Sequence, residues 1–315
     1  MMNTILEIKN LNVSFQRKDG GVKAVSNANL KVKKGSIFGL IGETGCGKSV
    51  LAHSLLRLLP ENAKTTGEVI YKDQTISSLP VEAIRKLRGK EIGLIAQSPG
   101  EALNPLLKNG AQVIAPMRLH RNLSKKESWR TAVELLEALD LPDPHQKMQE
   151  YPHQLSGGMK QRVLTALGIG GDPSLLIADE PTKGLDVLIR GQVVEVLQRL
   201  KEIKETTILL ITHDLQVAAH LCDELAVMYA GEIIEEGPSQ ELFKNPLHPY
   251  FKGLIDSLPS NGLKPIPGYS PSLVNLPNGC RFFDRCPKAE ATCGKIPPEI
   301  KEVTTGHKVR CRFID

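Results

Sequence analysis

The sequence predicts an α/β fold built on a parallel β-sheet, followed by a smaller C-terminal segment of different character. Short apolar runs recur at residues 37–41, 92–96, 175–178 and 208–212, each typical of a strand that is buried on both faces. Beyond residue 238 prolines become frequent and the periodicity fades. We therefore expect one domain over residues 1–237 and a separate extension over residues 238–315.

The bulk composition limits the classes of protein. With 315 residues and 41% hydrophobic content, the chain can form one large core or two modest ones. A net charge of +5 is mildly basic and lacks the dense basic stripe of a nucleic-acid binder, so we expect no nucleic-acid partner. We interpret the excess charge as a solvated surface, with an anionic ligand or a membrane surface as the alternative.

No segment of the sequence has the character of a membrane anchor or a leader. No apolar run approaches the roughly 18–20 residues that cross a bilayer. The first residues also lack the basic region and the long apolar stretch of a signal peptide. We expect a cytoplasmic protein that reaches a membrane only through a partner.

The predicted domain begins with strands. Residues 5–15 alternate apolar and polar side chains, as a half-exposed strand does, and residues 22–32 form a second strand-like stretch. A helix is expected from Lys48 to Leu59, where Pro60 stops it. Residues 224–237 indicate a strand hairpin that turns at Ala230-Gly231.

A long helical insert separates the second and third apolar runs. Ser124 and Glu127 have the spacing of a capping box, which marks the start of a helix. Apolar residues then follow at helical spacing, and we interpret this stripe as a packing face rather than a cofactor site. Its members are Trp129, Val133, Leu136 and Leu139.

A glycine-rich segment directly after residues 37–41 fits the phosphate-binding pattern G-x-x-x-x-G-K-[ST]. Its members are Gly42, Glu43, Thr44, Gly45, Cys46, Gly47, Lys48 and Ser49. Glycines let backbone N–H groups wrap the phosphates of ATP, and the helix behind them adds the positive end of its dipole. We expect Lys48 to reach the β- and γ-phosphates and Ser49 to ligate Mg²⁺. Cys46 occupies a variable position of the pattern, and we interpret it as a bystander.

Two adjacent carboxylates end the strand at residues 175–178. Asp179 is placed to hold Mg²⁺, as in other P-loop NTPases, and Glu180 is the best candidate to polarise the attacking water. On their own, paired acids after a strand would indicate a solvated turn. The phosphate-binding loop elsewhere in the chain reverses that interpretation.

Two further polar residues follow buried strands. Gln97 comes after residues 92–96, and its amide could contact Mg²⁺ or water. His213 comes after residues 208–212, where its imidazole could donate to the γ-phosphate and sense hydrolysis. A purely structural role is the alternative for His213, and a single Gln such as Gln97 is a weak signal by itself.

The segment at residues 155–162, LSGGMKQR, resembles the signature sequence of ABC ATPases. Ser156 stands at an N-cap position, with a helix expected over residues 159–167. In the family, this exposed anion site clamps the γ-phosphate of ATP that is held by the opposing subunit. The resemblance therefore implies that two subunits sandwich ATP. It assigns nucleotide contacts to Ser156, Gly157, Gly158 and Gln161.

The resemblance to ABC ATPases extends over residues 1 to about 237. It implies a RecA-like core, an antiparallel β subdomain and a helical subdomain at about residues 98–165. Phe15 matches the aromatic residue that stacks on adenine. The Q-loop, Walker B, D-loop and H-loop positions are matched by Gln97, Asp179, Glu180, Asp186 and His213. Gln97, Ser49 and Asp179 would then share the Mg²⁺ ion.

Two departures from the family pattern stand out. Lys183-Gly184 precedes Leu185-Asp186 where the family usually has Ser or Thr followed by Ala, which bears on communication across the dimer. Glycines replace the commoner alanines after the signature, and we expect them to shorten that helix. They are Gly168, Gly170 and Gly171.

The C-terminal extension resembles that of one importer branch, which comprises the oligopeptide, dipeptide and nickel transporters. The matching segments are residues 245–250 (NPLHPY), 276–282 (LPNGCRF) and 285–287 (RCP). Residues 159–162 (MKQR) resemble the D-type ATPase of these systems, which pairs with a second, non-identical ATPase. We expect such a partner, together with two transmembrane permease subunits and, indirectly, an extracytoplasmic substrate-binding protein.

Four of the six cysteines cluster in this extension at Cys280, Cys286, Cys293 and Cys311. In a reducing cytosol, such cysteines suit Zn²⁺ or an iron–sulfur cluster better than disulfides. Their spacing fits neither the usual zinc pattern nor the ferredoxin pattern, so spacing does not choose between them. Some relatives in the branch carry a [4Fe–4S] cluster at matching cysteines. That resemblance favours a structural [4Fe–4S] cluster, with Zn²⁺ or unliganded thiols as alternatives.

These features together predict an ATPase that powers an ABC importer for di- and oligopeptides. It would bind ATP and Mg²⁺ at the cytoplasmic face of the cell membrane as a peripheral subunit. One alternative is the ATPase of a nickel or metal-chelate importer of the same family. A soluble, non-transport ABC ATPase and a non-catalytic iron–sulfur sensor are the others.

Overall fold

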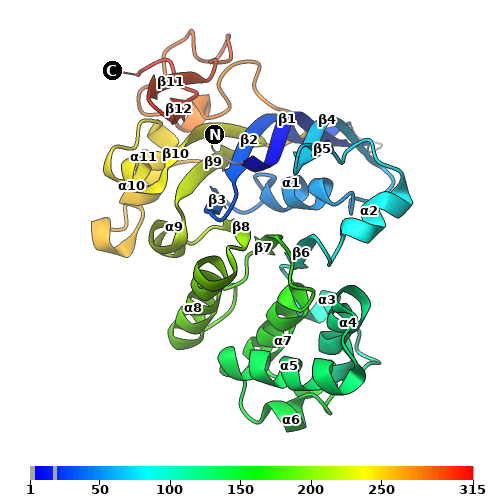
Figure 1. The fold of residues 1–315 in the computed structure, drawn as a ribbon. Coiled ribbons are helices and arrows are strands. Elements are labelled where there is room, and N and C mark those ends of the chain that lie inside the picture. The colour runs from blue at the N-terminus through cyan, green and yellow to red at the C-terminus, as the bar shows by residue number, and fades with distance from the viewer. Residues whose placement is uncertain (1–3, 17–19, 315) are drawn as a thin grey trace. The chain divides into compact units, whose positions relative to one another are not determined.

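The computed structural model describes residues 4–16 and 20–314 (Figure 1). The chain divides into two compact units. One comprises Lys33–Ile37 and Leu79–Ile211, and we call it the signature unit. The other comprises Met2–Val32, Phe38–Ser78 and Thr212–Asp315, and we call it the phosphate-loop unit.

A four-stranded sheet opens the phosphate-loop unit, in the order β2-β1-β4-β5. The strands are β1 (Thr4–Phe15), β2 (Val22–Lys33), β4 (Ala63–Tyr71) and β5 (Gln74–Thr75). β4 pairs antiparallel with both β1 and β5. Buried and exposed side chains alternate along β2, so the two N-terminal strands are confirmed as half-exposed strands. β4 and β5 were not predicted.

Five further strands of the phosphate-loop unit belong to a second sheet, in the order β11-β12-β10-β9-β3. They are β3 (Ile37–Ile41), β9 (Glu224–Tyr229), β10 (Glu232–Pro238), β11 (Lys301–Thr304) and β12 (His307–Val309). β3 and β9 are parallel, whereas β9 and β10 form an antiparallel hairpin. Ala230 and Gly231 turn it with φ of 45° and 88°, as the sequence predicted.

The extension adds the last two strands of this sheet, because β12 pairs with β10 and β11 pairs with β12. A buried carboxylate ties the extension further to β10. Glu235 accepts hydrogen bonds from the backbone N–H groups of Leu247 and His248, each at 2.8 Å. Its other contact is His307 Nε2, at 2.9 Å. A fully bonded buried carboxylate of this kind stabilises the region, whereas an unpaired one would destabilise it.

Four α-helices complete the described part of the phosphate-loop unit. They are α1 (Lys48–Leu55), α9 (Leu215–Leu221), α10 (Ser239–Lys244) and α11 (Pro249–Asp256). α1 begins where the sequence predicted but ends at Leu55 rather than Leu59. The reason is local, because Arg57 adopts the left-handed conformation with φ of 52°, which a continuing helix cannot accommodate.

Three parallel strands form the sheet of the signature unit. They are β6 (Ile92–Ile95), β7 (Leu175–Asp179) and β8 (Thr207–Thr212), with β7 in the middle. Every residue of β7 and β8 is buried, as expected from their uninterrupted apolar sequences. The strands predicted at these positions are confirmed to within one residue at each end.

Along the chain, the α-helices of the signature unit come before and between these strands. They are α2 (Val81–Leu87), α3 (Pro99–Ala102), α4 (Asn109–Arg121), α5 (Lys125–Ala138), α6 (Pro144–Lys147), α7 (Gly157–Ile169) and α8 (Val187–Lys204). α4, α5 and α7 pack against one another (Figure 1). The capping box of α5 is confirmed, since Ser124 Oγ accepts from Glu127 N–H and the Glu127 carboxylate accepts from Ser124 N–H. Val133, Leu136 and Leu139 are buried, so the predicted stripe is a packing face.

Of the glycines after the signature, Gly168 does not interrupt the helix, whereas Gly170 and Gly171 lie directly after its end. α7 continues through Gly168 to Ile169. A Cβ on Gly168 would lie 2.8 Å from the Leu94 carbonyl oxygen, and one on Gly93 would lie 2.5 Å from the Gly168 carbonyl oxygen. Both glycines therefore let α7 approach the backbone of β6 closely.

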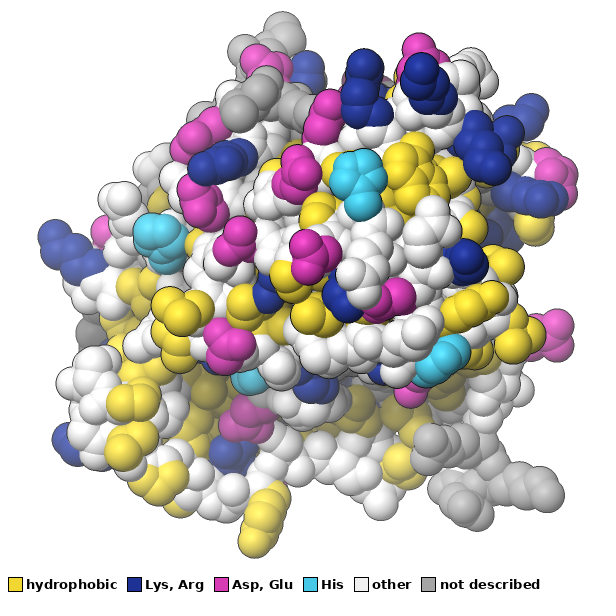
Figure 2. All heavy atoms as spheres, turned by 90° about the horizontal axis from the view of Figure 1, so that it is seen from below, with side chains coloured by type: hydrophobic (Ala, Val, Ile, Leu, Met, Phe, Trp, Pro, Cys, Tyr) yellow, Lys and Arg dark blue, Asp and Glu magenta, His cyan; other side chains and the backbone are white. Residues whose placement is uncertain are grey.

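The surface carries mixed charge. On the face that Figure 2 displays, Lys and Arg side chains are interspersed with Asp and Glu rather than gathered in one stripe. This distribution agrees with the interpretation of the net charge as solvated surface. Within the described residues, no helix combines the length and the apolar character needed to cross a membrane.

Candidate functional site

The phosphate loop lies between β3 and α1, against the β9–β10 hairpin. Gly42 and Gly47 have φ of 151° and 110°. A Cβ on Gly42 would lie 2.1 Å from the Met228 carbonyl oxygen, and one on Gly47 would lie 2.2 Å from the Ala24 carbonyl oxygen. Position 47 therefore requires glycine for two reasons. Its backbone is left-handed, and the backbone of Ala24 approaches it closely.

The ammonium group of Lys48 lies inside the loop. It donates to the carbonyl oxygens of Gly42 at 2.7 Å and Glu43 at 2.9 Å, and the residue is only 5% exposed. These contacts keep the loop curved around the positively charged ammonium group of Lys48. Such a curve at the N-terminus of α1 has the electrostatics of a phosphate site.

Cys46 contributes its backbone rather than its thiol. Its carbonyl oxygen accepts from Gly231 N–H at 2.8 Å, which fastens the loop to the hairpin turn. Burial raises the pKa of the Cys46 thiol, so the sulfur stays protonated. The geometry supports the prediction that this side chain takes no part in chemistry.

The predicted Mg²⁺ and water ligands of the signature unit follow neighbouring parallel strands. Gln97 follows β6, and Asp179 ends β7, whose Ala178 is paired with Ile95 of β6. Asp179 is fully buried, and Glu180 is 4% exposed. Because parallel strands end at the same edge of a sheet, the amide and both carboxylates lie at one edge of this unit.

Glu180 has an unusual backbone conformation. Its φ is 51°, and its N–H donates to the Ile211 carbonyl oxygen at 2.8 Å. A left-handed conformation at a residue that is not glycine is costly and occurs often at functional sites. The pairing with β8 holds this turn, so the carboxylate leaves the sheet in one defined direction.

The remaining predicted nucleotide residues lie in the phosphate-loop unit. His213 is exposed directly after β8, next to Asp214, which caps α9 by accepting from the N–H groups of Gln216 and Val217. Phe15 is half-buried at the end of β1 and is paired with Ala63 of β4. Each is thus held on a regular element, His213 at a helix entry and Phe15 at a strand end.

The signature segment presents an open helix N-terminus. Ser156 caps α7 by accepting from Met159 N–H at 3.3 Å. Within the described part of the chain, a Cβ on Gly157 would meet no atom within 4 Å, and one on Gly158 would meet only Leu185 at 3.6 Å. Gln161 differs from them, because it is 1% exposed and neither of its amide atoms has a hydrogen-bond partner among the residues that the structure describes. The exposed part of the signature is therefore Ser156 to Gly158.

Next to the signature in the same unit lies the segment that carries Asp186. This residue caps α8 by accepting from Ile189 N–H at 3.0 Å. Gly184 has a φ of 71°, a conformation that explains a glycine where the family usually has alanine. Val187 and Leu188 at the start of α8 are 78% and 80% exposed. Exposed apolar side chains beside an open anion site are typical of a surface that another protein covers.

The four cysteines of the extension share one small cavity. Cys280, Cys286, Cys293 and Cys311 line a space of about 20 Å³ together with Phe282, Phe283 and Phe313. Burial raises the pKa of Cys280 to about 11 and also raises the pKa values of Cys286 and Cys311. Among residues 4–16 and 20–314, however, no group of three or more His, Cys, Asp or Glu side chains is arranged to hold a metal ion. The four predicted ligands therefore line one cavity, but their arrangement does not confirm a metal or a cluster.

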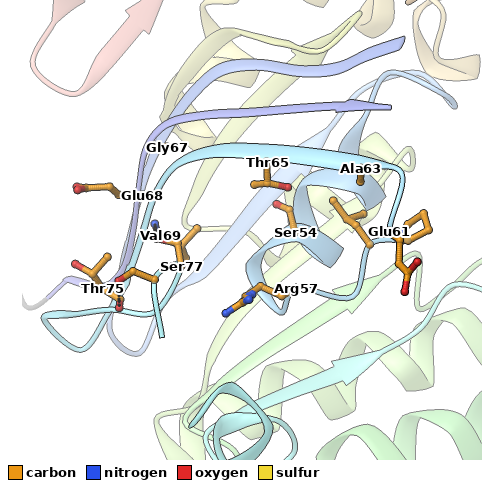
Figure 3. A pocket seen from close by; sticks show the side chains of 13 residues that line it. Ser54, Arg57, Glu61, Ala63, Thr65, Gly67, Glu68, Val69, Thr75 and Ser77 are labelled. Atoms are coloured by element: carbon orange, nitrogen blue, oxygen red, sulfur yellow. Dashed lines mark hydrogen bonds between the residues drawn. The ribbon is translucent and has the colours of Figure 1, made fainter. Parts of the chain in front are cut away.

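A separate cavity of about 650 Å³ contains none of the predicted site residues. Figure 3 shows it beneath β4, lined by Ser54 of α1, Arg57 just after that helix, Glu61, and Thr65 and Glu68 of β4. It lies within the phosphate-loop unit.

Sequence reasoning missed the residues that surround Glu43 in the loop. Tyr250, Ser270 and Arg285 contact its carboxylate or its backbone N–H, and Tyr229 accepts a hydrogen bond from Arg285. Tyr250 and Arg285 stand within the NPLHPY and RCP segments of the extension. The sequence analysis therefore singled out the segments that carry Tyr250 and Arg285. Nothing in the sequence, however, connects those segments with a loop more than 200 positions away.

Comparisons with known proteins agree with this geometry. The ABC transporter family matches residues 25–183, and the C-terminal region of oligopeptide/dipeptide transporters matches residues 234–293. The oligopeptide transport ATP-binding protein OppD of Escherichia coli is 40% identical over 98% of this chain and 93% of its own length. The dipeptide transport ATP-binding protein DppD of Bacillus subtilis is 40% identical over 100% of this chain and 96% of its own length.

Solved structures give the same family. The ATP-binding cassette MJ0796, solved as a dimer in a post-hydrolysis state with ADP and Pi, has a TM-score of 0.69 at 28% identity. It covers 75% of this chain and 99% of its own. CbiO1 of Clostridium perfringens, part of the complex cbiONQ, has a TM-score of 0.63 at 26% identity, over 77% of this chain and 92% of its own. The chain belongs to the ABC transporter family, in the branch of the oligopeptide and dipeptide transport ATP-binding proteins.

Proposed function

We propose that this chain is the ATP-hydrolysing subunit of an importer for di- and oligopeptides. It would act at the cytoplasmic face of the cell membrane, bound to two permease subunits that receive peptides from an extracytoplasmic binding protein. The relatives named for oligopeptide and dipeptide transport, and the matching C-terminal region, support peptides over nickel or metal chelates.

Within the proposed nucleotide site, each residue type suits its task. Lys48 and the loop N–H groups would bind the phosphates, and Phe15 would stack on adenine. Ser49, Gln97 and Asp179 offer the oxygen ligands that Mg²⁺ prefers. Glu180 would polarise the attacking water. Catalysis of this kind consists mainly of positioning and charge stabilisation.

His213 would donate a hydrogen bond to the γ-phosphate, and Asp186 would act across the subunit contact. The proposal of a shared site rests on the exposed signature, Ser156 to Gly158. No described residue has an atom within 4 Å of a Cβ placed on Gly157. The neighbouring Val187 and Leu188 offer apolar surface for a second subunit. We propose that this subunit is a non-identical ATPase. Each subunit's signature would then complete the other's phosphate loop.

We propose that residues 1–237 work as the nucleotide-binding domain, with the helical subdomain at about 98–165, and that residues 238–315 work as an extension. Cys280, Cys286, Cys293 and Cys311 would hold a [4Fe–4S] cluster there. Four thiols around one cavity fit the donor set of such a cluster. When bound, the cluster would supply iron–thiolate bonds that cross-link a loop-rich tail.

The cavity of about 20 Å³ admits one ion without rearrangement, whereas a four-iron cluster requires the thiols to move apart. Because burial raises the pKa values of Cys280, Cys286 and Cys311, binding of either metal must release protons from these thiols. Anaerobically purified protein should contain about four iron and four sulfide per chain. Stoichiometric zinc without sulfide would contradict the cluster and leave the ATPase assignment intact.

Transport by the reconstituted complex tests the function directly. Proteoliposomes that contain the complex should accumulate labelled di- or tripeptides in the presence of ATP and the binding protein. Nickel and metal chelates, supplied side by side, should not accumulate. Uptake of chelates without peptides would overturn the substrate, and hydrolysis that never drives uptake would overturn the transport function.

A further inference from the structure

The C-terminal extension holds the phosphate loop at Glu43. The guanidinium group of Arg285 makes a two-pronged ion pair with this carboxylate, with Nη1 to Oε2 at 3.0 Å and Nη2 to Oε1 at 3.1 Å. Arg285 is 8% exposed. Paired N–H donors on one carboxylate make a strong and geometrically specific contact, above all when water is excluded from one partner.

Arg285 is itself held in place by the extension and by β9. Its Nε donates to the Pro267 carbonyl oxygen at 3.0 Å, and Nη1 also donates to Ser270 Oγ at 3.1 Å and to the Tyr229 hydroxyl at 3.3 Å. Ser270 Oγ donates to the Glu43 carboxylate in turn. With these partners, the guanidinium has little freedom to turn away from the loop.

A second contact reaches the backbone of the same residue. The N–H of Glu43 donates to the hydroxyl oxygen of Tyr250 at 2.9 Å. Tyr250 is fully buried, and its ring packs 4.5 Å from that of Tyr229 and 5.5 Å from that of Phe282. Burial raises the pKa of the Tyr250 phenol far above its usual value, so the hydroxyl stays neutral at any physiological pH.

These contacts matter because of where Glu43 lies. A carboxylate in a phosphate-binding loop repels the triphosphate that the loop must bind. At an effective dielectric constant of about 40, two unit charges about 10 Å apart change an affinity about fourfold. A guanidinium paired with the carboxylate cancels that repulsion and leaves the loop with the charge of Lys48.

We propose that Arg285 is a positioning residue for ATP binding, which neutralises Glu43 and holds the first turn of the phosphate loop through it. The inference rests on the proposed ATP-hydrolysing function and deepens it. The nucleotide affinity of the loop depends on a side chain of the C-terminal extension. Arg285 directly precedes Cys286, one of the four cysteines around the small cavity. The segment that carries the cysteines therefore also carries the residue that holds the loop.

The test compares four variants with the wild-type chain in the assembled transporter. They are Arg285→Gln, Glu43→Gln, the double variant, and Arg310→Gln as a control; a fifth variant, Arg285→Lys, tests the fork geometry. Arg310 also precedes a cysteine, Cys311, and donates to the carbonyl oxygens of Ile233 and Pro298 rather than to the phosphate loop. Affinity for ATP is measured with a fluorescent ATP analogue, and KM and kcat are measured for hydrolysis.

Arg285→Gln should weaken ATP binding about fivefold or more and raise KM by a similar factor, with kcat changed less than about twofold. Glu43→Gln alone should weaken binding less than Arg285→Gln does, because it removes the repelling charge together with the ion pair. Adding Glu43→Gln to Arg285→Gln should restore the affinity to within about twofold of the wild type. Arg285→Lys keeps the charge but not the fork, so its affinity should lie between those of the wild type and Arg285→Gln.

Three results would overturn the proposal. One is wild-type affinity in Arg285→Gln. The second is a double variant that binds ATP as weakly as Arg285→Gln, since Arg285 would then not act through Glu43. The third is an equal loss in Arg310→Gln, which would indicate general damage to the extension. This test measures ATP binding, whereas the proposed function is tested by peptide transport. Failure of the wild type to transport peptides would therefore contradict the proposed function but not the role of Arg285.

Discussion

Single glycines determine whether the phosphate loop can form at all. Gly47 combines a φ of 110° with a neighbouring carbonyl oxygen 2.2 Å from the place of a Cβ, whereas Gly45, with a φ of 84°, has open space around it. Both positions strain any other residue, but only Gly47 also produces a clash. The pattern of the loop was predictable from sequence because phosphate binding uses the backbone, which admits few residue types.

We predict that Gly47→Ala destabilises the protein by more than about 3 kcal/mol, since it adds a clash to the cost of about 1–2 kcal/mol for a left-handed backbone. Gly45→Ala should cost only the contribution of the left-handed backbone, about 1–2 kcal/mol. Urea unfolding of both variants measures the difference. Equal losses for the two would contradict the close approach to Ala24.

Glu236 gives a prediction on pH. Burial raises its pKa above the usual 4.5, even though Lys308 Nζ lies 3.7 Å from its carboxylate. Below that usual pKa, the folded and unfolded chains both hold the proton. As pH rises, the unfolded chain ionises first, so stability is lost until the folded pKa is reached and then stays level.

Glu236→Gln should therefore be more stable than the wild type at about pH 7, and the difference should shrink towards about pH 4. Urea unfolding at a series of pH values measures it. A variant that is less stable than the wild type at neutral pH would show that the Lys308 pair outweighs the burial.

At the scale of elements, strong periodicity made the strands predictable. The parallel strands β6, β7 and β8 lie within one residue of their predicted ends, because continuous apolar runs have no other stable place in an α/β protein. α1 ends four residues earlier than predicted, since its end depends on the backbone of Arg57 rather than on Pro60. Helix ends of this kind depend on single dihedral angles that composition does not reveal.

The capping box of α5 gives a prediction at the same scale. Ser124→Ala should reduce the free energy of unfolding by about 1 kcal/mol, because it leaves a helix N–H without its partner. Lys126→Ala, an exposed change in the first turn of the same helix, should stay within about 0.5 kcal/mol of the wild type. Thermal unfolding of both variants measures this. An equal effect of the two would contradict a specific cap.

At the scale of the whole molecule, the extension was the least predictable part. Its prolines and cysteines indicated a separate tail. Yet β11 and β12 add to the sheet of β10, and Arg285 reaches Glu43 across 242 positions. Local patterns carry no information about such distant pairs. The identities of the catalytic candidates followed from the motifs, whereas the residues that support them required the structure.

The central claim concerns hydrolysis of ATP by this chain with Glu180 as the residue that polarises water. The direct measurement is the rate of Mg²⁺-dependent ATP hydrolysis by the reconstituted transporter with Glu180→Gln. Glu195→Gln, in an exposed ion pair with Arg199 on α8, serves as the control. The account predicts a loss of about a hundredfold or more at the site of this chain, with ATP still bound and the control unchanged. Turnover at the wild-type rate in Glu180→Gln would contradict it.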